Sequence, residues 1–185
     1  MNKRAFIVAL PEEIHHLEEI HGSPVLFCGV GKVNAALGIQ EIRRMGFTEV
    51  VNIGSCGSLA RPVGEVVRIG SVLQDIDCSP LCEYGHTAFE EQSHRIVLDP
   101  DLPDTCFTTD YFYDKNQASK YSPHYLAGIR GCSVFDMELY AIAKACRRYG
   151  MSLTSYKWVS DDGDHAQWAE NCLLSSRRVI DMLAG

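Results

Sequence analysis

Three short apolar runs in the first third of the chain most constrain its fold. They cover residues 5–10, 24–28 and 49–53, are short for helices, and are rich in β-branched and aromatic residues, which indicates buried strands. A helical pattern over residues 33–45 separates the last two runs and ends at Gly46. Strands that alternate with helices are typical of a mainly parallel sheet covered by helices.

The rest of the chain continues this alternation. Residues 78–101 lack periodicity and are expected to form a loop with an edge strand near 95–98. The sequence therefore predicts an α/β fold with a mixed, mostly parallel central sheet flanked by helices in three layers, in one domain over residues 1–185. The further expected elements are a short helix over 12–20, one or two strands within 65–77, a strand over 104–108, a helical turn over 116–121, an amphipathic helix over 136–149, a strand over 153–159 and a C-terminal helix over 165–183.

Composition excludes several classes of function. The net charge of −7 argues against a large nucleic-acid footprint, and no apolar run approaches the roughly 20 residues of a membrane span, so we expect a cytoplasmic protein with neither partner. None of the eight cysteines forms a CxxC pair, which favours buried free thiols. Cys78, Cys82 and His86 imitate a metal site but lack a fourth ligand, so we expect no metal and no cofactor.

Acidic side chains stand at the start of one predicted helix and at the end of one predicted strand. Met137-Glu138 opens the helix over 136–149, and Asp161 follows the strand over 153–159. An acid beside a methionine can hold sugar hydroxyls while apolar surface covers a flat ring, and an acid at a strand end can protonate a leaving group. Taken alone, Met137-Glu138 also fits a helix N-terminus, where the helix dipole favours an acid, and Asp161 also fits a solvated acidic loop.

Six segments of the chain, in order, resemble the nucleoside phosphorylase/nucleosidase superfamily, and in particular its methylthioadenosine/S-adenosylhomocysteine nucleosidase branch. That family breaks the N-glycosidic bond between a purine and ribose through a transition state that resembles an oxocarbenium ion. Residues 77–101 match the branch less well. The six segments are residues 5–13 (AFIVALPEE), 28–36 (CGVGKVNAA), 51–59 (VNIGSCGSL), 108–112 (TTDYF), 135–143 (FDMELYAIA) and 159–164 (VSDDGD).

The resemblance assigns the catalytic roles to two acids. It implies that Asp161 protonates purine N7 and that Ser160 orients it. A general acid needs a raised pKa, which the nearby acids of residues 162–164 could supply by like-charge repulsion. It implies that Glu13 activates the water, and the neighbouring Glu12 is the alternative. The simpler interpretation of either residue is an exposed acid at the start of a helix.

The resemblance also assigns the substrate contacts. It implies that Glu138 accepts hydrogen bonds from the ribose hydroxyls, that Met137 packs against the sugar, that Phe112 stacks on the base, and that Tyr113 supplies main-chain contacts; both aromatic residues could instead be core. The small residues Ser55, Cys56 and Gly57, expected in a turn, would let backbone N–H groups approach a polar ligand. Gly29-Val30-Gly31 lacks the rest of a dinucleotide motif, and a close contact between helix and strand explains it.

Two departures from the phosphorylases favour hydrolysis. Asn52 stands in the region where bacterial phosphorylases carry an arginine before the small-residue turn, and Pro11-Glu12-Glu13 occupies the first loop, where they carry another. An acid there would repel phosphate but could polarise water. We therefore expect a homodimeric purine nucleosidase that acts on a 5′-modified nucleoside such as methylthioadenosine or S-adenosylhomocysteine. A phosphate-dependent phosphorylase and a non-catalytic nucleoside-binding protein remain as alternatives.

Overall fold

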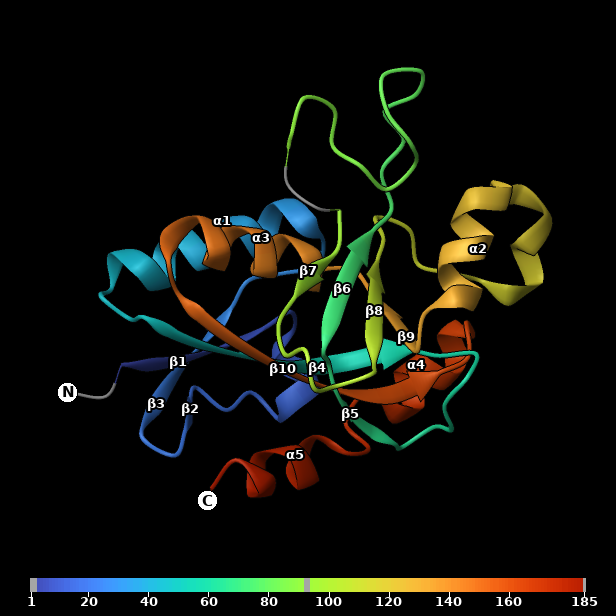
Figure 1. The fold of residues 1–185 in the computed structure, drawn as a ribbon. Helices are drawn as coiled ribbons and strands as arrows, with labels where there is room; N and C mark the ends of the chain where they lie inside the picture. The colour runs from blue at the N-terminus through green and yellow to red at the C-terminus, as the bar shows by residue number, and fades with distance from the viewer. Residues whose placement is uncertain (1–2, 92–93, 185) are drawn as a thin grey trace.

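The computed structural model describes residues 3–91 and 94–184; Met1 and Asn2, at the start of the predicted domain, lie outside them. Within the described residues ten strands form one sheet, in the order β2-β3-β1-β4-β9-β8-β6-β7, with β10 paired to β4 and β5 (Figure 1). The strands are β1 Arg4–Val8, β2 Glu19–Ile20, β3 Ser23–Phe27, β4 Glu49–Gly57, β5 Val66–Arg68, β6 Ser71–Gln74, β7 Ile96–Val97, β8 Thr105–Thr108, β9 Val134–Asp136 and β10 Ser152–Asp161.

The sheet is mixed and mostly parallel, which confirms the predicted fold class. β4 pairs in parallel with β1 and with β10, while β6, β8 and β9 form a second parallel group. The two groups meet through one antiparallel pair, Gly57 with Phe135. The β4–β10 ladder runs from Glu49 to Gly57, and an irregularity between Val159 and Asp161 interrupts it at the end where Asp161 lies.

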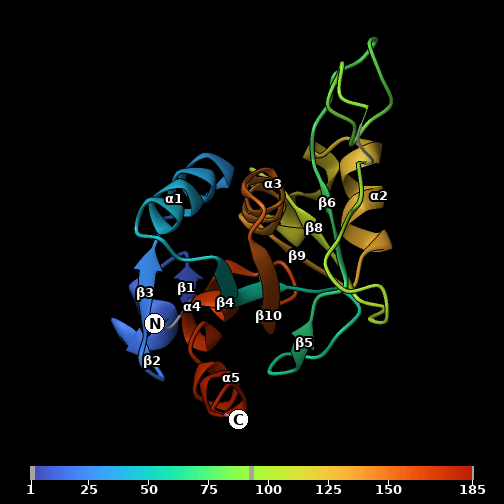
Figure 2. The same ribbon diagram turned by 60° about the vertical axis from the view of Figure 1, so that its left-hand side comes forward.

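Helices cover the sheet on both sides, as Figure 2 shows. α1 (Lys32–Arg44) and α3 (Leu139–Tyr149) lie side by side on one face and bury Ile39 and Ile142 against β1 and β4. On the other face α5 (Ser176–Met182) packs Val179 against a core that contains Trp158. α2 (Pro123–Gly131) closes a smaller aromatic core around Phe107. The amphipathic pattern therefore predicted the buried face of α3 correctly, whereas only part of the apolar pattern of α1 is buried: Ile39 and Ile42 face the core, but Leu37 and Met45 are exposed.

Three predicted helices differ from the structure. Residues 12–20 form a short 3-10 helix, η1 (Pro11–Ile14), followed by strand β2, because the chain turns through left-handed conformations at His15 and His16. The C-terminal helix is divided into α4 (His165–Asn171) and α5, and the indole N–H of Trp158 donates to the Cys172 carbonyl at the break. The helix predicted from residue 136 begins at Leu139, and Asp136 is the last residue of strand β9.

Two further differences concern shorter segments. α2 was not predicted, although Ser122 caps it and Pro123 stands at its first position, which is a recognisable start signal. The small residues of 54–57 belong to the end of β4 and do not form a turn.

The predicted helical turn at 116–121 is the 3-10 helix η2 (Lys115–Lys120), and the predicted edge strand is β7. No helix within residues 3–91 and 94–184 has the length and apolar character needed to cross a membrane.

Candidate active site

A cavity of about 200 Å³ opens where β1, β4, β9 and β10 reach their carboxyl ends. Ligand-binding groups gather at this edge in open α/β sheets because the loops that follow parallel strands meet there. Every predicted site residue except Ser160 lines it: Glu13, Ser55, Cys56, Gly57, Phe112, Tyr113, Met137, Glu138 and Asp161. The cavity thus brings together residues from five separate parts of the chain.

Asp161 is the last residue of β10 and is almost fully buried. The Ser160 hydroxyl donates to its Oδ2 at 2.8 Å, and the Gly163 N–H donates to its Oδ1 at 2.8 Å. Burial raises the pKa of Asp161 above its ordinary value; the Ser160 and Gly163 hydrogen bonds oppose the shift, and the charge of Asp162 adds to it. A raised pKa suits a carboxyl group that must hold a proton. Burial, more than the neighbouring acids, is the main cause.

Glu13 lies on η1 and points into the cavity, with 3% of its surface exposed, whereas Glu12 is exposed to solvent. Its Oε1 accepts from the Ser55 N–H at 2.7 Å and from the Ser55 hydroxyl at 2.6 Å, and its Oε2 accepts from the Leu10 N–H at 3.1 Å. The geometry therefore favours Glu13 over Glu12. It also gives Ser55 a different task from the predicted one, since its N–H contacts this carboxylate.

Glu138 precedes the first turn of α3 and is buried at the cavity wall. Its Oε1 accepts from the N–H of Gly31 at 2.9 Å, at the start of α1, where the helix dipole favours an anion. Gly31 has a φ of 97°, which a glycine adopts readily. Burial, with the charge of Asp136, raises the pKa of Glu138 to about 7, while Lys157 and the Gly31 N–H act in the opposite direction.

Aromatic and apolar side chains form the rest of the wall. Phe112 is 39% exposed and packs edge-on against His165. Tyr113 is buried and packs against Phe135, so its ring belongs partly to the core. Met137 is half-buried beside Glu138. A partly exposed ring such as Phe112 leaves room for a flat ligand to stack against it.

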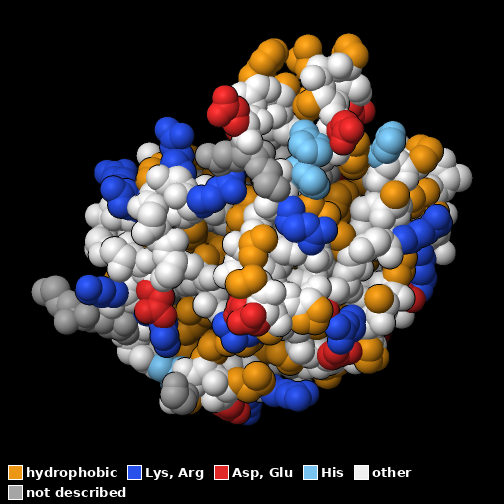
Figure 3. All heavy atoms as spheres, in the orientation of Figure 1, with side chains coloured by type: hydrophobic (Ala, Val, Ile, Leu, Met, Phe, Trp, Pro, Cys, Tyr) orange, Lys and Arg blue, Asp and Glu red, His pale blue; other side chains and the backbone are white. Residues whose placement is uncertain are grey.

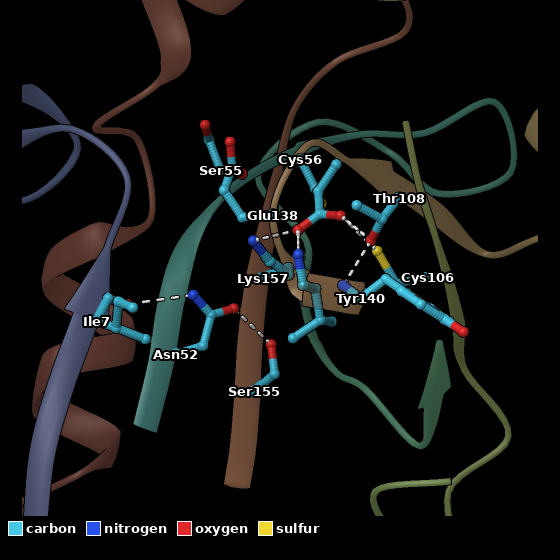
Figure 4. A network of polar contacts seen from close by, with 12 residues as sticks. Ile7, Asn52, Ser55, Cys56, Cys106, Thr108, Glu138, Tyr140, Ser155 and Lys157 are labelled. Carbon is cyan, nitrogen blue, oxygen red and sulfur yellow. Dashed lines mark hydrogen bonds and ion pairs between the residues drawn. The ribbon is translucent and has the colours of Figure 1, made fainter. Parts of the chain in front are cut away.

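Trp168 and Lys157 are two of the residues in or next to the cavity wall that the sequence did not identify. Trp168, on α4, lines the cavity and donates its indole N–H to the Ser55 hydroxyl at 3.1 Å, which completes a chain from Trp168 through Ser55 to Glu13. Lys157, which is labelled in Figure 4, lies fully buried on β10 and pairs with Asp136 at 2.8 Å. A lysine between Tyr156 and Trp158, in a segment predicted to be a strand, is a signal that could have revealed it.

Asn52 does not reach the cavity. Its amide donates to the Ile7 carbonyl and accepts from the Ser155 hydroxyl, so it joins three strands within the sheet (Figure 4). The contrast drawn between Asn52 and a phosphorylase arginine therefore carries less weight than expected. A direct observation replaces it: the part of the cavity wall that the structure describes contains neither lysine nor arginine.

The fold and the cavity define an α/β protein with a cavity at the carboxyl ends of its strands. The sequence model of the phosphorylase superfamily matches residues 15–184, and the protein belongs to that superfamily, as the resemblance predicted. A 5′-methylthioadenosine/S-adenosylhomocysteine nucleosidase from Exiguobacterium sp. (strain ATCC BAA-1283 / AT1b) is 27% identical over 182 residues, which cover 84% of this chain and 77% of the relative.

Solved structures agree with this fold. The 5′-methylthioadenosine/S-adenosylhomocysteine nucleosidase of S. pneumoniae, determined with a transition-state inhibitor, superposes with a TM-score of 0.79 at 21% identity and covers 98% of this chain and 96% of its own. The futalosine hydrolase of Helicobacter pylori superposes with a TM-score of 0.80 at 17% identity and covers 97% of this chain and 94% of its own. At such identities the likeness establishes the fold.

Proposed function

We propose that the protein is a purine nucleosidase, an N-glycosyl hydrolase that splits a 5′-modified nucleoside such as methylthioadenosine or S-adenosylhomocysteine into a free base and a ribose derivative. The observation that carries this proposal is the convergence of three buried carboxyl groups, Asp161, Glu13 and Glu138, on one cavity. The activity named for the curated relative supports it.

In the proposed reaction each carboxyl group does a different task. Asp161 gives its proton to N7 of the purine, so that the base leaves neutral as the bond between N9 and C1′ breaks. Glu138 accepts hydrogen bonds from the ribose hydroxyls and places negative charge near the developing cation. Glu13 takes a proton from the water whose oxygen attacks C1′. Phe112 would stack on the base, and Met137 would pack against the sugar.

The composition of the cavity wall favours water over phosphate as the nucleophile. A phosphate site needs cationic side chains or several free backbone donors to offset the desolvation of the anion. The Ser55 N–H, the backbone donor nearest Glu13, already donates to that carboxylate. An ionised Glu13 at this position would repel phosphate, whereas it can accept a proton from water.

The test is mass-spectrometric detection of free base from a panel of nucleosides, with and without phosphate. The panel contains methylthioadenosine, S-adenosylhomocysteine, futalosine, because one structural relative is a futalosine hydrolase, and unmodified adenosine and inosine. Base release without phosphate supports the nucleosidase. Release that requires phosphate, with ribose 1-phosphate as product, would make the protein a phosphorylase. Binding of nucleosides without release would make it a binding protein.

We also infer that the protein forms a homodimer in the cytoplasm. Large apolar side chains stand exposed on α1, where Val33 is 75% and Leu37 is 58% exposed, and in the segment between β6 and β7, where Leu81 and Phe89 are exposed. Figure 3 shows hydrophobic side chains gathered at the top of the molecule, over that segment. Exposed apolar surface of this kind favours a protein partner. All eight cysteines are free thiols, which fits a reducing compartment. A monomer in light scattering at working concentration would contradict the dimer.

A further inference from the structure

A fully buried ion pair lies beside the proposed ribose site and has no part in the mechanism above. Lys157 Nζ and Asp136 Oδ2 are 2.8 Å apart, and their side chains are 2% and 1% exposed. Taking two charges out of water costs several kcal/mol for each ion, so a buried pair seldom stabilises a fold more than apolar residues of the same size would. Its presence next to a functional carboxylate therefore calls for another explanation.

Asp136 connects the pair to the turn that carries Glu138. The Thr108 hydroxyl donates to Asp136 Oδ1 at 2.6 Å, and the Leu139 N–H donates to Asp136 Oδ2 at 2.9 Å. Thr108 also accepts from the Tyr140 N–H at 2.9 Å. The first two backbone donors of α3 are thus held by one small network, whose labelled members lie toward one another in Figure 4.

The ionisable groups around Glu138 come from four parts of the chain. Asp136 on β9 and Glu13 on η1 are anions, and Cys28, after β3, is a thiol whose pKa burial raises to about 12, so it stays neutral. Lys157 on β10 is the cation among the described groups that act on Glu138, and the Gly31 N–H adds a partial positive charge. Glu138 therefore responds to Asp136 and Lys157 in opposite directions.

We propose that Lys157 and Asp136 are positioning residues for Glu138: Asp136 fixes the turn that presents it, and Lys157 supplies the positive charge that lets it stay ionised at the ribose site. The ribose role rests on the proposed function, whereas the effect of the pair on Glu138 does not. An ionised Glu138 is needed because a protonated carboxyl group would lose one acceptor position and its negative charge.

Two single substitutions should move Glu138 in opposite directions. Lys157→Met removes the cation, so the pKa of Glu138 should rise by about one unit or more. Asp136→Asn removes the anion and leaves Lys157, so the pKa should fall by a similar amount. The measurement is a carbon-13 NMR titration of protein labelled at the glutamate carboxyl carbons, with Glu138→Gln used to assign the signal. This measurement needs no catalytic turnover.

Further variants separate charge from folding. Lys157→Arg keeps the positive charge and should leave the Glu138 titration near that of the parent protein. The double variant Asp136→Asn with Lys157→Met carries no buried charge at this pair, so it should fold even if Lys157→Met alone does not. Its Glu138 pKa should lie above that of Asp136→Asn, because only the single variant keeps the cation.

Activity gives the second readout. Where base release is observed, the apparent pKa of the acid limb of the kcat/KM profile should follow the Glu138 pKa measured by NMR. This apparent pKa should be higher in Lys157→Met and in the double variant than in Asp136→Asn. A Glu138 pKa that is unchanged, or that moves in one direction in both single variants, would overturn the inference and leave the pair a structural feature. Opposite shifts without any base release would support the inference while the nucleosidase proposal fails.

Discussion

At the scale of single residues, burial decides which of several similar acids is suited to chemistry. Asp161 is buried and has a raised pKa, whereas Asp162, the next residue, is half-exposed and pairs with Lys115 at 2.7 Å. Glu13 faces the cavity while Glu12 faces solvent. Neighbouring acids have the same chemistry, so the sequence pattern locates the segment that contains them but does not show which one is buried. For Glu13 the family resemblance pointed to the buried residue.

Replacing Asp161 with Asn tests the general acid. The amide fills the same space but has no carboxyl proton to give to N7, so base release should fall by about 10²–10⁴-fold while nucleoside binding persists. Turnover and calorimetric binding would be measured on the same preparation. Asp99→Asn, which changes a carboxylate paired with Arg68 outside the cavity, should keep the parent rate. A slow variant that also fails to bind would show that Asp161 holds the substrate and would not identify it as the acid.

Replacing Trp168 with Phe tests the chain from Trp168 through Ser55 to Glu13. The variant keeps an aromatic ring at the cavity but loses the indole N–H that donates to the Ser55 hydroxyl. Losing one such hydrogen bond should lower kcat about fivefold, equivalent to roughly 1 kcal/mol. In a Glu13→Gln background the same change should have little further effect, because the two residues act through one hydroxyl. Additive losses would mean that Trp168 acts independently of Glu13.

At the scale of elements, the meeting of β4 with β9 sets the floor of the cavity. Gly57 pairs with Phe135, and a Cβ atom added to Gly57 would overlap the Phe135 ring. The glycine is required there by close approach. Strand β9 itself was not predicted. Its three residues stand just before a helix and resemble the helix's first turn in sequence, and only their pairing with β8 shows that they form a strand.

Replacing Gly57 with Ala should therefore destabilise this junction. The added methyl group must displace Phe135, and overpacking of this kind costs about 1–3 kcal/mol of unfolding free energy. Urea unfolding would measure the loss. Gly131→Ala is the matched control, because an added Cβ at Gly131 meets nothing within 4 Å, and it should change stability by less than about 0.5 kcal/mol. Equal stability of both variants would show that the Phe135 ring moves freely.

At the scale of the whole molecule, the site stores electrostatic free energy that should appear in the pH dependence of stability. The pKa of Glu138 is raised from 4.5 to about 7 in the folded protein. A raised pKa means that the folded state binds the proton more tightly than the unfolded state does. Proton binding by Glu138 therefore makes its full contribution to the free energy of unfolding below about pH 4.5. This contribution, about 3 kcal/mol in total, is lost as the pH rises through about 7.

Glu138→Gln isolates this contribution because the amide does not titrate. The difference in unfolding free energy between Glu138→Gln and the parent should shift in favour of the variant between pH 4.5 and 8, measured by urea unfolding at several pH values. Glu12→Gln changes an exposed glutamate and should follow the parent curve. A constant difference between Glu138→Gln and the parent across this range would contradict the raised pKa.

The sequence by itself determined the class of fold and the parts of the chain that form the site. Short apolar runs and 3.6-residue patterns depend on local alternation of polar and apolar residues, so β1, β3, β4, α1 and α3 could be located from them. The family motifs added Glu13, Glu138 and Asp161, all of which line one cavity; their catalytic roles stay predictions.

Only the tertiary structure decided how these parts act on one another. The Lys157–Asp136 pair joins residues 21 positions apart on two strands, and the indole of Trp168 reaches Ser55 across 113 positions. Such contacts depend on which strands become neighbours, and no local pattern records that. Burial has the same origin, since the raised pKa values of Asp161 and Glu138 arise when distant segments exclude water from carboxyl groups that an isolated segment would leave solvated.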